Sequence, residues 1–134
     1  MENIALAVVI RYGRVLIQER YRKNRGMVFE FPGGTIDPSE TPEAAAFREL
    51  WEETSVKADA HIATYSDENE FGGKVFFVVM AIDDAALPQP TDPLRLQSFH
   101  WCKIPDIPLH TFHRADINFI VRHLPKYIRH ARRC

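Results

Sequence analysis

The segment GTIDPSETPEAAAFRELWEETSV, residues 34–56, decides the fold of this chain because it joins a glycine-led loop to one amphipathic helix. Thr41 can cap the helix, Pro42 suits its first turn, and Glu43 favours its positively polarised end. The pattern predicts a helix over residues 42–54. At about 100° per residue, five of its side chains share one face that we expect to pack against a sheet. They are Ala44, Phe47, Leu50, Trp51 and Thr54.

Three glutamates gather on the opposite face of this predicted helix, within about 100° of arc. They are Glu49, Glu52 and Glu53. Like charges at this spacing repel by about 0.2–0.5 kcal/mol per pair, and Arg48 is the helix's one cation to offset them. The face is either a solvated acidic surface or a site for a hard cation. Mg²⁺ takes oxygen ligands and keeps water and substrate phosphates in its shell.

The loop before the helix favours the cation site. From Gly34 the chain has five residues, then Glu40, then seven residues, then Arg-Glu-Leu-Trp-Glu-Glu-Thr-Ser-Val over residues 48–56. This spacing resembles the signature of the Nudix hydrolases, G-x5-E-x7-R-E-U-x-E-E-x-G-U with U aliphatic. Residues 30–34, Glu-Phe-Pro-Gly-Gly, also resemble the family. Ser55 stands where the family has glycine, so either the helix exits differently or a strain of about 1 kcal/mol is accepted.

The resemblance implies a metal-dependent hydrolase. Nudix hydrolases cleave a diphosphate linkage in a nucleoside diphosphate derivative, with Mg²⁺ or Mn²⁺ and water. By resemblance, Glu49, Glu52 and Glu53 bind the metal, and Glu49 or Glu53 takes the proton from water. The backbone carbonyl of Gly33 completes the metal site, since glycine lets the main chain approach closely. Arg48 is expected to orient catalytic Glu49 by an ion pair.

Gly34 and Glu40 complete the signature. Arg48 is expected to form an ion pair with Glu40 as well as with Glu49, which is a structural role. A carboxylate from a later loop often joins the site in the family, and Asp92 is the nearest candidate. For the whole chain the resemblance implies an α/β (α+β) Nudix fold. In this fold a mixed β-sheet is sandwiched between helices as an α/β/α sandwich.

The remaining sequence supplies the strands of this sheet. Alternating or continuous apolar runs predict strands over residues 4–10, 15–20, 28–31, 60–65, 74–82 and 99–103. Tyr12-Gly13 is a plausible hairpin turn, and Pro32-Gly33-Gly34 should stop the third strand. Residues 83–93, with three prolines, are predicted as a loop. A final helix containing Phe112 and Leu124 should end near Pro125.

Two residues outside the signature are candidates for substrate binding. Arg20 ends a predicted strand and either meets a substrate phosphate or sugar or is a surface arginine. Asp116 enters the last helix, so it either caps the helix or reads the purine base. The segment from His110 to Leu124 resembles the ending of MutT-type members. We therefore favour a MutT-type nucleoside triphosphate diphosphohydrolase, with oxidised purine nucleotides among its substrates.

Two other functions stay open at this stage. One is a Nudix hydrolase of a nucleotide sugar, a dinucleoside polyphosphate or an RNA 5′ end. The other is a non-enzymatic nucleotide-binding module, which usually loses the glutamates that this chain keeps.

The composition is that of an ordinary globular protein. The chain has 134 residues, 46% of them hydrophobic, with 17 Lys and Arg against 18 Asp and Glu and a net charge of −1. This length fits one domain, residues 1–134. The near-neutral charge argues against dedicated nucleic-acid binding, the longest apolar run (75–82) is too short for a membrane, and two cysteines form no disulfide framework. We expect a cytoplasmic protein that binds a small nucleotide, either a monomer or a homodimer.

Overall fold

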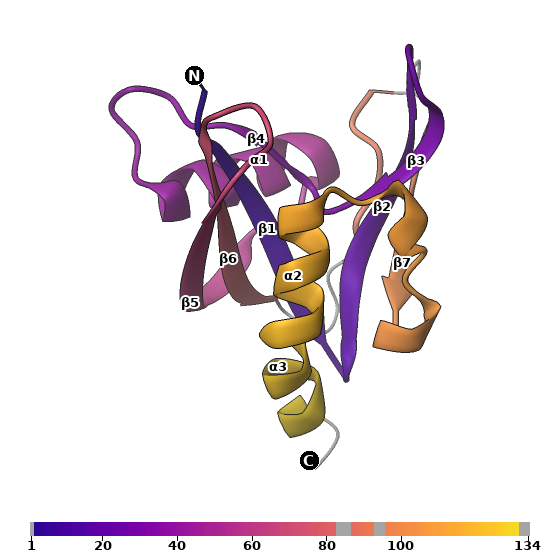
Figure 1. The fold of residues 1–134 in the computed structure, drawn as a ribbon. Helices are drawn as coiled ribbons and strands as arrows, with labels where there is room; N and C mark the ends of the chain where they lie inside the picture. Colours follow the sequence, from indigo (N-terminus) through magenta and orange to yellow (C-terminus); the bar gives the residue numbers. More distant parts are fainter. Residues whose placement is uncertain (1, 83–86, 93–95, 132–134) are drawn as a thin grey trace.

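The computed structural model describes residues 2–82, 87–92 and 96–131 (Figure 1). Seven strands form one mixed sheet: β1 (Ile4–Arg11), β2 (Arg14–Arg22), β3 (Gly26–Glu30), β4 (Gly33–Thr35), β5 (Ala58–Glu68), β6 (Lys74–Ile82) and β7 (Gln97–Cys102). The helices are α1 (Pro42–Thr54), α2 (Arg114–Arg122) and α3 (Leu124–Ala131), with short 3-10 turns at Ile104–Asp106 and Leu109–Thr111. Within the described residues, no helix is long and apolar enough to cross a membrane.

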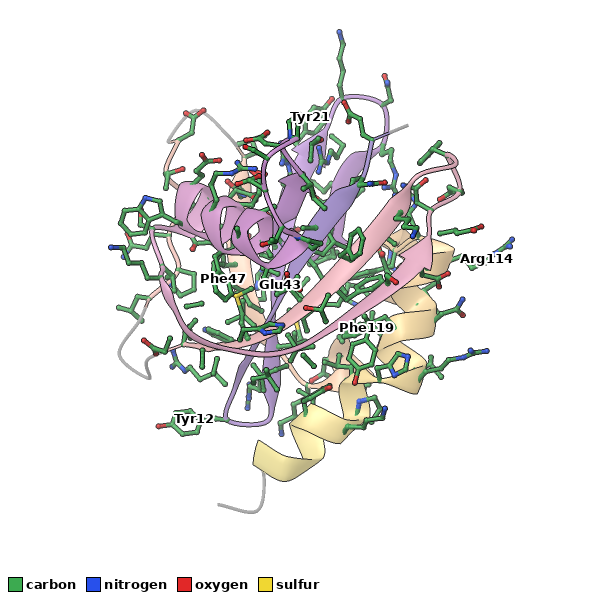
Figure 2. All side chains as sticks on the ribbon, turned by 90° about the vertical axis from the view of Figure 1, so that its left-hand side faces the viewer. Tyr12, Tyr21, Glu43, Phe47, Arg114 and Phe119 are labelled. Atoms are coloured by element: carbon green, nitrogen blue, oxygen red, sulfur yellow. The ribbon has the colours of Figure 1, made fainter. Side chains whose placement is uncertain are left out.

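Helices cover both faces of the sheet, as the sequence predicts. On one face α1 packs over β1 and β4, and this contact buries the α1 side chains of Ala45, Ala46 and Leu50. On the other face α2 and α3 close a larger core, in which the ring of Phe119 stacks on Phe77 with centroids 4.5 Å apart. Figure 2 shows this arrangement edge-on, with α1 and α2 on opposite sides of the strands. The α/β/α sandwich is confirmed.

The sheet divides along β1, which is the feature that makes room for a site. The start of β1 pairs with β4, and its end pairs with β2 through Ile10 and Arg11. Between these pairings β2 leaves β1, as Figure 1 shows, and turns to pair with β3 and β7 instead. The backbone N–H of Ala7 donates to the carbonyl of Pro32 at 2.7 Å within this division. On its other edge β1 runs parallel to β6.

Most of the predicted strands are confirmed, and local turn chemistry explains why. Tyr12 and Gly13 both take positive φ, 50° and 73°, which gives the tight hairpin expected between β1 and β2. The glycine pair does more than predicted, since Gly33 and Gly34 begin strand β4 instead of only ending β3. Of the predicted loop at 83–93, residues 83–86 and 93 lie outside the described part, and residues 87–92 have no regular structure.

The C-terminal prediction is wrong in one respect. Helix α2 ends at Arg122, close to the expected boundary, but a second helix starts at Leu124 and carries Pro125 in its first turn. Proline is tolerated there because the first helical N–H groups have no intrahelical partner.

The predicted sheet-facing side of α1 is confirmed for Leu50 and Thr54, which are buried, and wrong for Trp51 and Ala44. Trp51 is 49% exposed and Ala44 is exposed, whereas Glu53 is only 7% exposed. The face that meets the sheet is the one with small side chains, Ala45 and Ala46, and Glu53 lies in its middle. The three glutamates therefore do not form a solvated face opposite the core. Their end of the helix turns inward toward the division in the sheet.

The helix α1 ends on a left-handed residue, Ser55, with φ 61° and ψ 22°, and its N–H donates to the carbonyl of Trp51 at 2.9 Å. Of the two exits that the sequence leaves open, the chain takes the one that glycine tolerates best and accepts the strain of a β-carbon.

We predict that Ser55→Gly raises the free energy of unfolding by about 1 kcal/mol, because glycine removes this strain. Urea unfolding of the two proteins measures it. Ser55→Ala is the control and should give no gain, since alanine keeps the β-carbon. Equal stability of the glycine variant and the wild type would show that the serine carries no strain here.

Candidate active site

Arg48 is the centre of an ion-pair cluster between the loop of residues 34–41 and α1. Its Nε and Nη2 donate to the two carboxylate oxygens of Glu40 at 2.7 and 2.9 Å. Its Nη1 lies 3.0 Å from Glu52 Oε1 and 3.5 Å from Glu49 Oε1, and Nη2 also donates to the Thr35 carbonyl at 3.2 Å. The Arg48 hydrogen bond lowers the pKa of Glu40 to about 2, so this carboxylate stays ionised and the loop stays fastened to the helix.

Burial has the largest effect on the pKa of Glu53, whereas the Arg48 hydrogen bond has the largest effect on that of Glu40. Glu53 Oε2 accepts a hydrogen bond from the Gly33 N–H at 3.1 Å. Its Oε1 is buried without a hydrogen-bond partner among the described residues. Desolvation, followed by the nearby charge of Glu49, raises the pKa of Glu53 to about 7, while the Gly33 N–H, Arg20 and Gln18 act in the opposite direction.

The two glycines of β4 allow close neighbours to approach, β1 beside Gly33 and α1 beside Gly34. A β-carbon on Gly34 would overlap the carboxylate of Glu49, and one on Gly33 would overlap the carbonyl oxygen of Ala5. At Gly33 the obstacle is backbone, so only hydrogen fits, whereas at Gly34 a β-carbon would displace the Glu49 carboxylate. This contact brings the main chain of Gly33 beside the carboxylates of α1.

The donor set fits a hard cation such as Mg²⁺. Glu49 and Glu53 offer carboxylate oxygens, and Gly33, whose N–H donates to Glu53, offers a backbone carbonyl. Burial also raises the pKa of Glu49, against the lowering effect of the Arg48 charge. Within the described residues no three Asp, Glu, His or Cys side chains already converge on one point. Mg²⁺ commonly uses one or two carboxylates and completes its shell with water and phosphate oxygens.

Glu52 differs from the other two glutamates of the helix. Its side chain is 53% exposed and pairs with Arg48. The predicted ligand trio is thus unequal in burial, with Glu53 inside, Glu49 at the boundary and Glu52 outside.

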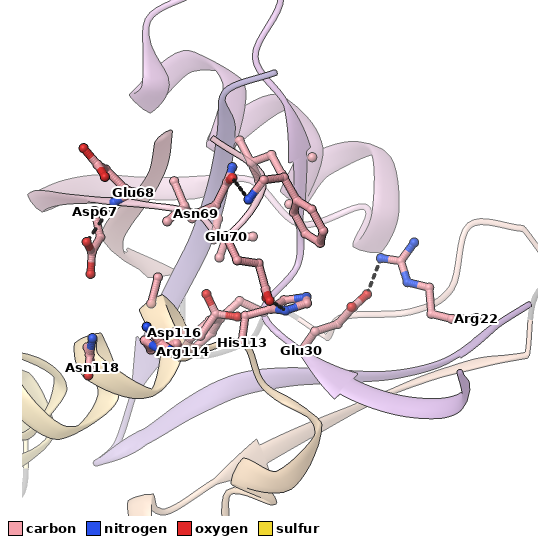
Figure 3. A pocket seen from close by; sticks show the side chains of 18 residues that line it. Arg22, Glu30, Asp67, Glu68, Asn69, Glu70, His113, Arg114, Asp116 and Asn118 are labelled. Carbon is pink, nitrogen blue, oxygen red and sulfur yellow. Dashed lines mark hydrogen bonds and ion pairs between the residues drawn. The ribbon is translucent and has the colours of Figure 1, made fainter. Parts of the chain in front are cut away.

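A cavity of about 600 Å³ opens on the other side of the glycine pair (Figure 3). Gly33 and Gly34 form part of its wall, the turn between β5 and β6 forms another, and the start of α2 a third. Two side-chain contacts join residues that line it, an ion pair of Arg22 with Glu30 at 2.6 Å and a hydrogen bond between His113 and Glu70 at 2.5 Å. The size suits a nucleoside and its phosphates.

Asp116 lies on the wall of this cavity and is 7% exposed. It stands in the first turn of α2, where the backbone N–H of His113 hydrogen-bonds to its carboxylate. The two roles that the sequence leaves open for Asp116, capping the start of α2 and facing a substrate, are therefore compatible. Burial raises the pKa of Asp116 to about 6, helped by the charges of Glu30 and Glu70 and opposed by His113.

The comparisons with known proteins agree with this geometry. The NUDIX domain family profile matches residues 1–123. The chain belongs to the NUDIX family. It is 42% identical over 57 residues to an RNA pyrophosphohydrolase of Tolumonas auensis and 41% identical over 61 residues to one of Yersinia enterocolitica. These matches cover 42% and 45% of this chain but 31% and 33% of those proteins, so the chain spans about a third of the length of the curated relatives it matches.

Solved structures show the same fold. The E. coli ORF135 protein superposes with a TM-score of 0.68 at 23% identity over 92% of this chain and 89% of that one. A C. elegans Ap4A hydrolase gives 0.74 at 18% identity over 95% and 98%, and a MutT NUDIX hydrolase from Burkholderia pseudomallei gives 0.66 at 23% over 87% and 93%. At these identities the likeness concerns the fold.

The remaining predicted residues lie around the NUDIX helix. Arg20 is not among the described residues that line the cavity, but its charge acts on Glu53. Asp92 follows Thr91, whose hydroxyl donates to the carbonyl of Glu52 at 2.7 Å, so this loop runs along the end of α1. A role for Asp92 in metal binding stays a prediction.

Sequence reasoning missed two polar residues at this NUDIX site, Gln18 and Glu30. The amide of Gln18 donates to the carboxylate of Glu30 at 3.0 Å, and Gln18 is only 1% exposed. A signal for Gln18 is present in the sequence, because it is a polar residue that follows three apolar ones in a predicted strand.

We predict that Asp116→Asn changes the pH dependence of stability. With a pKa of about 6, folded Asp116 holds a proton that the unfolded chain loses near pH 4. The stability linked to this proton is complete below about pH 4 and is lost as pH rises through about 6. The asparagine variant lacks this loss, so it should gain about 2–3 kcal/mol relative to the wild type between pH 4 and pH 7.

Urea unfolding of both proteins at several pH values measures this gain. Asp59→Asn, at an exposed position on β5, is the control and should follow the wild type. Parallel stability curves for Asp116→Asn and the wild type would contradict the assigned burial effect.

Proposed function

We propose that this NUDIX protein hydrolyses a nucleoside triphosphate to a nucleoside monophosphate and pyrophosphate, using Mg²⁺ or Mn²⁺. One observation carries the proposal. Gly33 and Gly34 contact Glu53 and Glu49 on one side and form the wall of the 600 Å³ cavity on the other. A nucleotide in this cavity has its phosphates beside the buried carboxylates. A cytoplasmic location is part of the same proposal.

The proposed reaction is attack of water on phosphorus with release of pyrophosphate. The metal, when bound by Glu49, Glu53, Glu52 and the Gly33 carbonyl, neutralises charge on the phosphate oxygens. Glu49 or Glu53 accepts the proton that the water loses as its oxygen bonds to phosphorus. Arg48 holds the loop and Glu49 in place.

In this proposal Asp116, which lines the cavity, recognises the base. Ionised Asp116 accepts hydrogen bonds only, which suits the N1–H and exocyclic amine of a guanine edge. Protonated Asp116 can also donate, which suits an oxidised or adenine-type edge, and its pKa of about 6 makes both forms accessible.

An RNA 5′ end is the second candidate substrate, favoured by a specific observation. The identity with the RNA pyrophosphohydrolases is local but reaches about 40%. The β2–β3 hairpin carries Arg22, Lys23 and Arg25, and Tyr21 beside them is 51% exposed. Cations and an exposed ring are features that bind single-stranded nucleic acid. The catalytically inactive module is disfavoured because all three glutamates are present.

A substrate panel tests these proposals. The panel contains the four nucleoside triphosphates, oxidised purine nucleotides, a nucleotide sugar, a dinucleoside polyphosphate and a 5′-triphosphate oligonucleotide, each with Mg²⁺ and with excess EDTA. Hydrolysis of free triphosphates to monophosphate and pyrophosphate, abolished by EDTA, supports the first candidate. Preference for the oligonucleotide supports the second. Full activity in EDTA overturns the metal assignment, and no hydrolysis of any substrate overturns the enzyme.

We expect Glu53→Gln to lower kcat at least about a hundredfold, because it removes a charge while keeping the shape of the side chain. Glu43→Gln is the matched control on the same helix. Glu43 accepts a hydrogen bond from Thr64 at 2.7 Å and faces away from the site, so this variant should hydrolyse at the wild-type rate. Wild-type rates in both variants would show that the signature glutamate takes no part in the reaction.

Asp116→Ala separates base reading from helix capping. If Asp116 reads the base, the variant raises KM and loses about 1–3 kcal/mol of discrimination among purine nucleotides, with kcat on the poorest substrate unchanged. Measured kcat/KM values for GTP, ATP and their oxidised forms give the result. An unchanged substrate ranking with a lower melting temperature would end the base-reading role.

A further inference from the structure

A second cavity, which we call the hairpin cavity, lies at the end of β1 that leads into β2. It has a volume of about 470 Å³ and is formed by the β1–β2 hairpin, the 3-10 turn after β7 and the first turns of α3. Its apolar lining comes from Ile104 and Pro105 after β7 and from Pro125 and Ile128 in α3. The volume falls within the range of about 300–1,000 Å³ that is usual for ligand pockets. The proposed hydrolysis makes no use of this cavity.

The charged side chains of the hairpin cavity are cations. Arg14 and Lys103 line it, and both are exposed. The guanidinium group of Arg11 adds a third positive charge beside them, since it lies 5.8 Å from the ring centroid of Tyr12, another lining residue. Asp106 follows Pro105 in the chain, but no carboxylate is among the described residues that line the cavity. An apolar cavity with cations around it is complementary to a partner that carries an apolar side chain next to carboxylates.

The chain itself carries such a segment in the turn between β5 and β6. Residues 67–71, which we call the acidic turn, are Asp-Glu-Asn-Glu-Phe and include three carboxylates and no cation. All three acidic residues are exposed, and Phe71 is 68% exposed. Glu70 hydrogen-bonds to His113, yet its side chain keeps 54% of its exposure. In charge and in polarity the acidic turn is the complement of the hairpin cavity.

The acidic turn is already ordered in the folded chain. The Oδ1 atom of Asn69 accepts hydrogen bonds from the N–H groups of Phe71 and Gly73 at 2.8 and 3.1 Å. The N–H of Asn69 donates in turn to the carbonyl of Gly73 at 2.8 Å. A segment with a fixed backbone loses less conformational entropy when it binds than a loose one does. The acidic turn can therefore dock without first having to fold.

The acidic turn and the hairpin cavity lie at opposite ends of the sheet (Figure 1). Strand β1 runs parallel to β6, with Ile4 paired to Val75 and Ile10 paired to Ala81. The turn before β6 therefore lies at the start of β1, and the hairpin cavity lies at its end. Eight residues of strand separate them by about 25 Å. Tyr12 marks the hairpin end in Figure 2. The acidic turn cannot enter the cavity of its own chain, so only a second copy can bring one there.

We infer that the acidic turn of one copy docks in the hairpin cavity of a second copy. Phe71 enters among the apolar residues of the cavity, and the carboxylates pair with Arg14 and Lys103. The contact joins two unlike surfaces, so every added copy presents a further turn and a further cavity, and assembly continues head to tail. One turn in one cavity is a small contact, which makes the association weak and dependent on concentration. The inference goes beyond the proposed hydrolysis and does not depend on it.

Sedimentation velocity of the whole chain tests the association. Between about 10 µM and about 1 mM the wild type should form species larger than a dimer. Phe71→Ser removes the apolar anchor and Arg14→Glu reverses a charge of the cavity, so each should weaken the association at least about tenfold. Raising the salt concentration from about 50 mM to about 500 mM should weaken it as well, because salt screens exposed charges.

Two matched variants control for general changes of the surface. Leu87→Ser removes an apolar side chain that is also 68% exposed, and Lys23→Glu reverses an exposed charge outside the hairpin cavity. Both should associate as the wild type does. Equal weakening in these variants would overturn the assignment of the two surfaces.

Mixing the two test variants separates this contact from every symmetric one. Phe71→Ser keeps an intact cavity and Arg14→Glu keeps an intact turn, so each alone should stay monomeric where the wild type assembles. Their equimolar mixture should form a 1:1 dimer and nothing larger, because only one matching turn and cavity remain. This rescue also shows that both variants are folded.

A wild type that stays monomeric up to about 1 mM, or that stops at a symmetric dimer, would overturn the inference. So would a mixture of the two variants that does not pair. A wild type that stays monomeric while its hairpin cavity binds an unrelated acidic peptide would overturn the second copy as the occupant.

Discussion

The contact between α1 and the Gly33–Gly34 strand is the constraint on which the rest of the structure depends. The main chain of β4 lies so close to its neighbours that a β-carbon on Gly34 would displace the Glu49 carboxylate of α1, and one on Gly33 would overlap the backbone of β1. The helix therefore turns its small residues, Ala45 and Ala46, toward the sheet and leaves Trp51 in solvent. The same approach carries Glu53 inward and forms a wall shared by the carboxylates and the cavity.

The glutamates of the site show how their surroundings set their chemistry. Glu40 is held by two hydrogen bonds from Arg48, which keep it ionised. Glu53 has one backbone donor and little solvent, and burial favours its neutral form. Glu40 is thereby structural and satisfied, whereas Glu53 lacks a compensating charge, and a nearby cation would stabilise its ionised form.

The sequence predicts what is decided locally and fails where distant segments meet. The bounds of α1 follow from Thr41, Pro42 and the left-handed exit at Ser55, all of which act within one turn. Its orientation does not follow, because apolar periodicity weighs Trp51 above alanine and contains no information on how closely β4 approaches. The family signature identifies the glutamates by number, yet Gln18, the buried amide that bonds to Glu30 at the site, comes from β2 and its other partner, Gln97, from β7. No spacing in the sequence relates them.

The parallel pairing of β1 with β6 has a consequence for synthesis of the chain. Strand β1 leaves the ribosome first, but the residues that pair along its length, Val75 to Ala81, are made only after β2, β3, β4, α1 and β5. Until then an apolar strand has one open edge, and such edges invite pairing with other chains.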